Sequence, residues 1–164
     1  MTGSMESSQR DLDTFDLGLI RELRRRPELS VSELARLLDA PRGTVQSRRQ
    51  RLERWGVITG YGPDVDPVRA GFAVTAFTSL EITQGAHDET TAALRGINQV
   101  IEIHTVTGAG DLLCRLIARS NTDLHEVLQR VTAIPTVLRS QTQIALSTQL
   151  HRTPADVLAQ LVIR

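Results

Sequence analysis

Pro41 stands between two short segments with helical patterns, and this arrangement restricts the fold of the chain more than any other feature. The first segment opens with Ser30 and Glu33, whose spacing predicts a capping box in which each side chain accepts the backbone N–H of the other residue. A proline disfavours helical geometry in the residue before it, so this helix should stop at Ala40. The next helix should begin at once, because a first turn tolerates proline. Two short helices in this order predict a helix-turn-helix.

The second helix of this pair, residues 41–54, contains five arginines and one acidic residue, Glu53. Val45 and Leu52 are spaced to share one buried face. The opposite face is small and polar near its start, which suits the DNA major groove, where Arg and Gln read base edges and other arginines neutralise phosphates. A solvated amphipathic helix is the alternative reading of this segment alone. We predict DNA contacts by Arg42, Gly43, Thr44, Gln46, Ser47, Arg48 and Arg51, with phosphate contact and packing both open for Arg48 and Arg51.

Composition excludes several other classes of protein. The formal charge is zero, so the clustering of arginines on one helix carries the nucleic-acid inference, not the net charge. A single cysteine, Cys114, excludes an intramolecular disulfide and a multi-cysteine zinc site. No segment has the length and apolarity of a membrane span, and the N-terminus lacks a signal-peptide core. The histidines lie in separate predicted elements without a catalytic motif; they are His87, His104, His125 and His151. We expect a cytoplasmic protein that is not an enzyme and needs no cofactor or metal.

The N-terminal third reads as a small helical domain. Residues 1–11 are polar and predict a disordered tail, and Asp13 can cap a first helix with Asp16 in its first turn. Gly56 suits a left-handed helix terminus, and Val57 to Tyr61 predicts a short strand, the wing of a winged helix. We place a helix-turn-helix domain at 12–62 and a polar linker at 63–71.

The second half changes to a period of two. Residues 72–82 alternate and predict a strand with apolar residues on both faces. A helix at 86–95, strands at 100–107 and 112–118, a helix capped by Thr122 or Asp123, and a strand from 137 to about 150 follow. This β-α-β-β-α-β order is the ferredoxin-like pattern, so the expected fold class is α+β. We place this domain at 72–150 and a further amphipathic helix within 151–164.

Short motifs at matching spacing resemble one family. They are Leu12-Asp13 with Asp16, Glu33-Leu34-Ala35, Thr44-Val45 with Arg48, Arg51-Leu52-Glu53, Gly56-Val57-Ile58, Gly60-Tyr61, Val106-Thr107-Gly108 with Asp111, and Thr142. Together they resemble the Lrp/AsnC (leucine-responsive/asparagine-regulator) family of prokaryotic transcription factors, over roughly residues 12–147. The resemblance implies a winged helix-turn-helix head joined by a strand linker to a ligand-sensing body. It also implies homodimers joined through bodies and hinge strands, often assembled into tetramers or octamers. Effectors, usually amino acids, would bind between bodies.

The resemblance also assigns an effector site to Thr105, Thr107, Gly108, Ala109, Asp111 and Thr142. Asp111 would hold an ammonium group and the loop amides a carboxylate, with Thr105 and Thr142 in the same pocket if their strands are neighbours. Without the resemblance, residues 108–111 read as a plain hairpin turn. The sequence departs from the family pattern at Pro41 (usually a capping serine), at Gly110 (often an aromatic) and at Thr136 (often a glycine).

The leading function is sequence-specific binding of double-stranded DNA that regulates transcription in response to a small metabolite. An architectural protein that wraps DNA with little sequence preference is the alternative, and its specificity ratio should be small. A third class is a metabolite sensor that acts on a partner enzyme through the body alone. Affinity for DNA that salt weakens steeply would argue against that class.

Overall fold

The computed structural model describes residues 12–161, so the tail predicted at 1–11 lies outside the described residues. The chain divides into two compact units. The head runs up to Pro63 and takes in the chain again from Leu150, whereas the body comprises Asp64–Gln149. The helix predicted near the C-terminus therefore belongs with the head.

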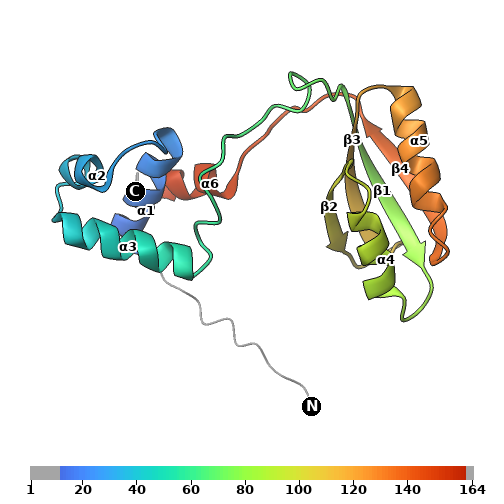
Figure 1. Ribbon diagram of the computed structural model, residues 1–164, viewed down its shortest axis with the longest axis horizontal. Helices are drawn as coiled ribbons and strands as arrows, with labels where there is room; N and C mark the ends of the chain where they lie inside the picture. Colours follow the sequence, from blue (N-terminus) through green and yellow to red (C-terminus); the bar gives the residue numbers. More distant parts are fainter. Residues whose placement is uncertain (1–11, 162–164) are drawn as a thin grey trace, which may run out of the picture. The chain divides into compact units, whose positions relative to one another are not determined.

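Four helices build the head: α1 (Thr14–Arg25), α2 (Val31–Leu37), α3 (Arg42–Arg54) and α6 (Pro154–Leu161). Their apolar stripes meet in one core made of Leu19, Ile20, Leu23, Leu34, Val45 and Leu52. Helix α6 lies against α1, and its Ala155 and Leu158 pack on this core (Figure 1). Arg24 of α1 and Asp156 of α6 add an ion pair with an N···O distance of 3.8 Å.

Local capping signals set the starts of α1 and α2 as predicted. Asp13 and Asp16 form a capping box, and so do Ser30 and Glu33. The N–H of Ser30 donates to Glu33 Oε2 at 2.8 Å, and the N–H of Glu33 donates to Ser30 Oγ at 3.3 Å. The predicted stop at Ala40 is wrong: α2 ends at Leu37, because Asp39 adopts a left-handed conformation with φ 48° that breaks the helical run before the proline.

The strand predicted at Val57–Tyr61 does not form. Gly56 takes the predicted left-handed conformation, with φ 69°, and the Leu52 carbonyl then accepts the N–H groups of Val57 and Ile58 at 3.0 and 3.2 Å. The Tyr61 hydroxyl donates to Glu53 Oε1 at 2.5 Å. These contacts hold the segment against α3, and it has no neighbouring strand with which to form a ladder in the described head.

The body is a four-stranded antiparallel sheet in the order β2-β3-β1-β4. Its strands are β1 (Val74–Ile82), β2 (Val100–Thr105), β3 (Leu112–Ala118) and β4 (Val137–Ala145). Helices α4 (His87–Arg95) and α5 (Asn121–Thr132) cover one face and share its core (Figure 1). This is the predicted ferredoxin-like order.

The faces of β1 alternate as predicted. Ala76, Thr78 and Leu80 are buried under the helices, whereas Phe77, on the other face, is 38% exposed. No helix of the body covers that second face in the part of the chain that the structure describes.

Several boundaries in the body differ from the predictions. Strand β1 begins at Val74 and not at residue 72. Strand β4 ends at Ala145 and not near Leu150, because Ala145 pairs with Thr75 at the start of β1 and few residues of β1 remain to pair. Strand β2 ends at Thr105 because Val106 begins the turn to β3. The cap of α5 is Ser120, whose Oγ accepts from the Asp123 N–H at 3.1 Å, and neither Thr122 nor Asp123 fills that position.

Candidate DNA interface and effector site

Helix α3 is fixed in the head by one apolar side and presents the other to solvent. Val45 and Leu52 have no exposed surface, as their spacing predicted. Five predicted DNA contacts lie on the exposed side of the first two turns: Arg42, Gly43, Thr44, Gln46 and Ser47. The Ser47 hydroxyl donates to the Thr44 carbonyl at 3.1 Å, so its oxygen is left to accept.

The start of α3 suits a phosphate. Pro41 is the N-cap and provides no side-chain cap, as its departure from the family pattern implied, and the first turn contains no acidic residue. Backbone N–H groups at a helix N-terminus lack intrahelical partners and carry partial positive charge. Arg42 stands exposed beside them, so this end of the helix can accept an anion.

Arg48 and Arg51 point away from this surface and toward α1. Arg51 Nη2 lies 2.5 Å from Asp16 Oδ2, and Arg48 Nη1 lies 3.3 Å from Asp16 Oδ1. Arg48 also pairs with Asp13. The Asp16 side chain is fully buried, and the two arginines are 28% and 29% exposed. Of the two roles left open by the sequence, the structure shows packing; phosphate contact by these arginines stays a prediction.

Arg49 is also held by its surroundings. Its Nε donates to Glu53 Oε1 at 3.0 Å and to the Tyr61 hydroxyl at 2.9 Å, and its guanidinium lies 4.6 Å from the Tyr61 ring centroid. This cluster joins the segment after the helix to α3 itself. The carboxyl of Glu53 has a pKa below its ordinary value because it accepts hydrogen bonds, first from Tyr61 and then from Arg49.

Sequence reasoning missed two exposed residues on the same side of α3. Gln50 follows Gln46 by four residues, and Arg54 follows Gln50 by four, so all three lie along one stripe of the helix. Both Gln50 and Arg54 are exposed. The four-residue spacing itself was the available signal, and it extends the candidate DNA surface by two turns.

The predicted effector loop is a hairpin turn after β2 whose exposed residues include Thr107, Gly108, Ala109 and Asp111. Gly108 has φ 115°, a conformation that a side chain would strain. Gly110 packs so closely on β1 that a Cβ would lie 2.2 Å from Ser79 Oγ. Asp111 is partly engaged: its Oδ2 accepts the Ile82 N–H at 2.9 Å, and its own N–H donates to the Leu80 carbonyl at 2.8 Å.

The two threonines assigned to the same pocket do not meet within the chain. The sheet order places β2 and β4 at opposite edges, so the expectation that these strands are neighbours is wrong for a single chain. Thr142 Oγ1 lies 3.0 Å from Thr78 Oγ1, whereas Thr105 Oγ1 lies 3.1 Å from His87 Nε2. The order follows from the crossover through α5, which delivers β4 to the far side of β1.

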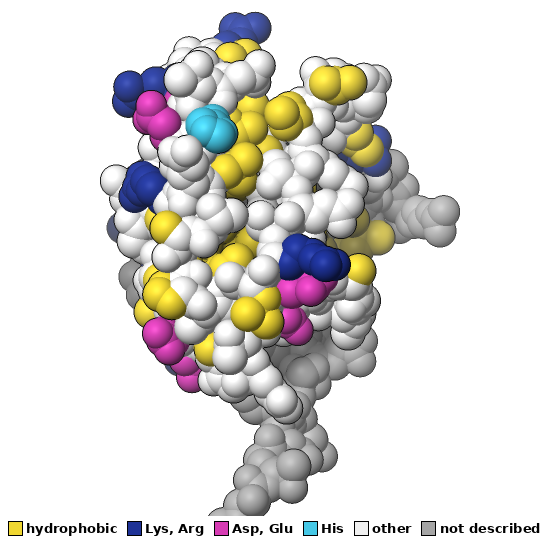
Figure 2. Space-filling model, turned by 90° about the vertical axis from the view of Figure 1, so that its right-hand side faces the viewer, with side chains coloured by type: hydrophobic (Ala, Val, Ile, Leu, Met, Phe, Trp, Pro, Cys, Tyr) yellow, Lys and Arg dark blue, Asp and Glu magenta, His cyan; other side chains and the backbone are white. Residues whose placement is uncertain are grey.

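On the side of the molecule shown in Figure 2, acidic and basic side chains are interspersed with hydrophobic ones and form no patch of one sign. Among residues 12–161, no cluster of three or more His, Cys, Asp or Glu side chains has the arrangement of a metal site. No helix among the same residues is long and apolar enough to cross a membrane.

Comparisons with known proteins agree with this architecture. Residues 12–59 match the model of a winged helix-turn-helix DNA-binding domain, and residues 75–155 match that of the Lrp/AsnC ligand binding domain. The HTH-type transcriptional regulator Ptr1 of Methanocaldococcus jannaschii is 32% identical over 117 residues, which cover 71% of this chain and 79% of that protein. The chain belongs to the Lrp/AsnC family.

Solved structures of Lrp/AsnC proteins have the same fold. Escherichia coli AsnC superposes with a TM-score of 0.83 at 24% identity, over 88% of this chain and 99% of that one. A feast or famine regulatory protein from M. tuberculosis, solved in complex with L-methionine, gives a TM-score of 0.76 at 30% identity, over 86% and 96%. The predicted fold class and the predicted function of a DNA-binding transcriptional regulator with a ligand-binding body are confirmed.

Proposed function

We propose that this Lrp/AsnC protein reads double-stranded DNA through the exposed stripe of α3 and that an amino acid bound at the body changes its DNA binding or its assembly. The proposal of DNA binding rests on how the side chains of α3 are distributed between the interior of the head and its surface. Arg48 and Arg51 are held by Asp16 inside the head, while Thr44, Gln46 and Gln50 remain exposed and polar. A helix fixed from behind presents its reading side chains on a backbone that does not need to be ordered on binding.

Sequence-specific regulation and architectural wrapping differ in one measurable quantity. Selection of bound duplexes from a random pool, followed by titration of the selected and a scrambled duplex, gives the specificity ratio. A regulator should select a defined sequence, and Gln46→Ala should relax preference at one base position by about 1–3 kcal/mol. Gln129→Ala, an exposed glutamine on α5, serves as the control. Equal affinity for both duplexes would favour the architectural function.

The effector part rests on the hairpin Thr107–Asp111, with its exposed amides and one carboxylate. Asp111 Oδ2 already accepts the Ile82 N–H, which leaves Oδ1 for a ligand ammonium group. Because Thr105 and Thr142 lie on opposite edges of one sheet, a site that uses both needs a second copy of the chain. A thermal-shift panel of the twenty amino acids tests this part, since a ligand at a hundred times its Kd stabilises the protein by about 2.7 kcal/mol. No shift with any of them would contradict it.

We place the contact between two copies of the chain on the sheet face that bears Phe77, and tetramers or octamers would be built from such dimers. That face has no helix of its own body over it, and a partner's sheet would cover it. Phe77→Glu should lower the mass measured by multi-angle light scattering. Thr132→Glu, an exposed change on α5, is the matched charge control. A mutant that keeps the full mass would argue against assembly through this face.

A further inference from the structure

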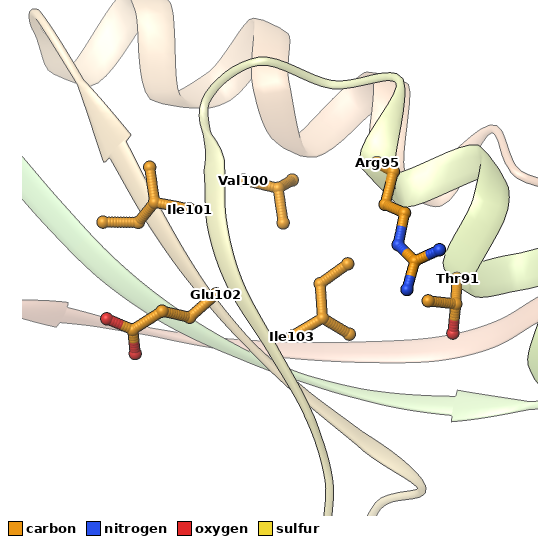
Figure 3. Close-up of a pocket in the computed structure, with 6 residues that line it drawn as sticks. All are labelled: Thr91, Arg95, Val100, Ile101, Glu102 and Ile103. Atoms are coloured by element: carbon orange, nitrogen blue, oxygen red, sulfur yellow. The ribbon is translucent and has the colours of Figure 1, made fainter. Parts of the chain in front are cut away.

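A groove lies between the C-terminal end of α4 and the edge strand β2, on the covered side of the sheet (Figure 3). Its volume is about 310 Å³. The lining side chains are Thr91, Arg95, Val100, Ile101, Glu102 and Ile103. None of the residues assigned to the effector hairpin lines it, so the groove is a second candidate site on the body.

Two polar groups of α4 in this groove lack partners. Arg95 and Thr91 lie one helical turn apart, and Figure 3 shows both side chains projecting from α4 toward β2. Thr91 Oγ1 is buried and has no hydrogen-bond partner among the described residues. Within that same part of the chain, Arg95 forms no ion pair. A buried hydroxyl without a partner is uncommon, and an ordered water or a bound group can satisfy it.

Strand β2 supplies the apolar part of the lining. Val100 and Ile103 face the α4 side of β2 in Figure 3, and both pack on the core of the body. The strand is irregular here, with a register shift between Val100 and Glu102. Such irregularities re-aim side chains next to binding sites.

Glu102, the acidic residue of the lining, is already occupied. Its Oε1 accepts from Arg115 Nη1 at 2.8 Å, and its Oε2 lies 3.3 Å from His104 Nε2. In Figure 3 its carboxylate lies on the opposite side of β2 from Arg95. The groove therefore offers a cation, a hydroxyl and apolar walls, but no free acid for an ammonium group.

We propose that this groove binds a small aliphatic monocarboxylate, such as a branched-chain 2-oxo acid or a short fatty acid. Its carboxylate accepts from the guanidinium of Arg95, an exposed residue, and, once the Thr91 side chain turns toward the groove, from the Thr91 hydroxyl. Its hydrocarbon chain packs on Val100 and Ile103. An amino acid is disfavoured because its ammonium group would lie beside Arg95 without a counter-charge. The site thus separates an amino acid from its deaminated counterpart.

The test is calorimetric titration of the full chain without DNA, so its outcome is independent of the proposed regulatory function. The probes are 4-methyl-2-oxopentanoate and isovalerate, with leucine and 3-methylbutanol as the zwitterionic and uncharged comparisons. We expect saturable binding of both carboxylates with a Kd of about 1 mM or tighter. Leucine and the alcohol should bind at least about tenfold more weakly.

Variants locate the binding. Arg95→Met keeps the aliphatic stem and should weaken both carboxylates about tenfold or more, and Thr91→Val should weaken them about threefold or more. Arg69→Met removes the same charge from an arginine of the body that is 89% exposed, and it should bind like the wild type. Arg95→Gln is a second charge-removing variant if the first does not fold. Three results would overturn the proposal. They are that neither carboxylate binds, that the Arg95 variants bind the carboxylates as tightly as the wild type does, or that leucine binds as tightly as the carboxylates do.

Discussion

Replacing Asp16 by alanine should destabilise the head while leaving the DNA-reading surface of α3 chemically intact. The Asp16 carboxylate is fully buried and accepts from Arg51 at 2.5 Å and from Arg48 at 3.3 Å. Removing one partner of a buried ion pair costs about 3–5 kcal/mol, and exposed pairs contribute about 0.2–1 kcal/mol. Because the two arginines are 28% and 29% exposed, water can partly compensate them. We expect a loss of about 2–3 kcal/mol, and about 1–2 kcal/mol for Arg51→Met, which leaves Arg48 on Asp16.

The sequence provides its own probe for this measurement. Trp55 is the only tryptophan, and the Arg51 guanidinium lies 4.7 Å from its ring centroid. Urea unfolding followed by tryptophan fluorescence therefore reports on the head and gives the free energy of unfolding from the midpoint and slope. The control is another Asp→Ala replacement, Asp88→Ala on α4 of the body, which should leave the unfolding of the head unchanged. Asp39→Ala in the head would not serve, because Asp39 has a positive φ.

The salt dependence of DNA affinity distinguishes an arginine in an internal ion pair from an arginine that contacts a phosphate. The slope of log K against log salt concentration is negative, and its magnitude falls by about 0.9 for each phosphate contact that is lost. Arg42→Met, at the exposed start of α3, should reduce the magnitude of this slope by about one. For Arg51→Met, packing on Asp16 alone gives an unchanged slope, whereas an added phosphate contact gives a reduction of about one. If Arg51→Met kept wild-type stability and reduced the slope by about one, our assignment of Arg51 to the interior of the head would be refuted.

Three further predictions test the rest of the structure. Leu158→Ala on α6 should destabilise the head by about 1–2 kcal/mol through lost packing, whereas Leu161→Ala, 58% exposed, should be neutral in the same fluorescence assay. Gly110→Ala should destabilise the body by about 1–3 kcal/mol because its Cβ meets Ser79 Oγ, and Ser79→Ala should recover most of this loss in a double-mutant cycle. A hydrogen bond from Arg26 lowers the pKa of the Glu22 carboxyl, and one from Ser30 lowers the pKa of the Glu33 carboxyl. The stability that these carboxylates contribute is therefore fully present above the ordinary pKa of 4.5, and it is lost as the pH falls through their lower pKa values in the folded protein. Glu22→Gln with Glu33→Gln should flatten that acid loss, and a variant whose acid unfolding is as steep as the wild type would contradict this reasoning.

Features set by neighbouring residues were predictable from the sequence, and features set by distant ones were not. The caps at Asp13 and Ser30 involve residues three apart, and the alternation of β1 needs only the strand itself. The strand expected at Val57–Tyr61 failed because a strand needs a partner that the segment alone does not specify. The edges occupied by Thr105 and Thr142 depend on sheet order, which strand patterns leave undetermined.

The same limit applies to the candidate DNA surface. Exposure of Arg42, Thr44 and Gln46 followed from the spacing of Val45 and Leu52. The pairing of Arg51 with Asp16 joins residues 35 positions apart, and no local pattern could specify it. An arginine-rich helix therefore shows where a basic surface can form, while the buried carboxylate decides which arginines remain available to it.

The inclusion of α6 in the head has a consequence for synthesis of the protein. A ribosome makes α1, α2 and α3 before the body and α6 after it. Domains generally fold in the order in which they emerge, yet Ala155 and Leu158 can join the core of the head only after the body has been translated. A nascent or prematurely terminated chain therefore carries α3 on a head whose core is incomplete. Completion of the DNA-binding unit is in this way tied to completion of the sensing unit.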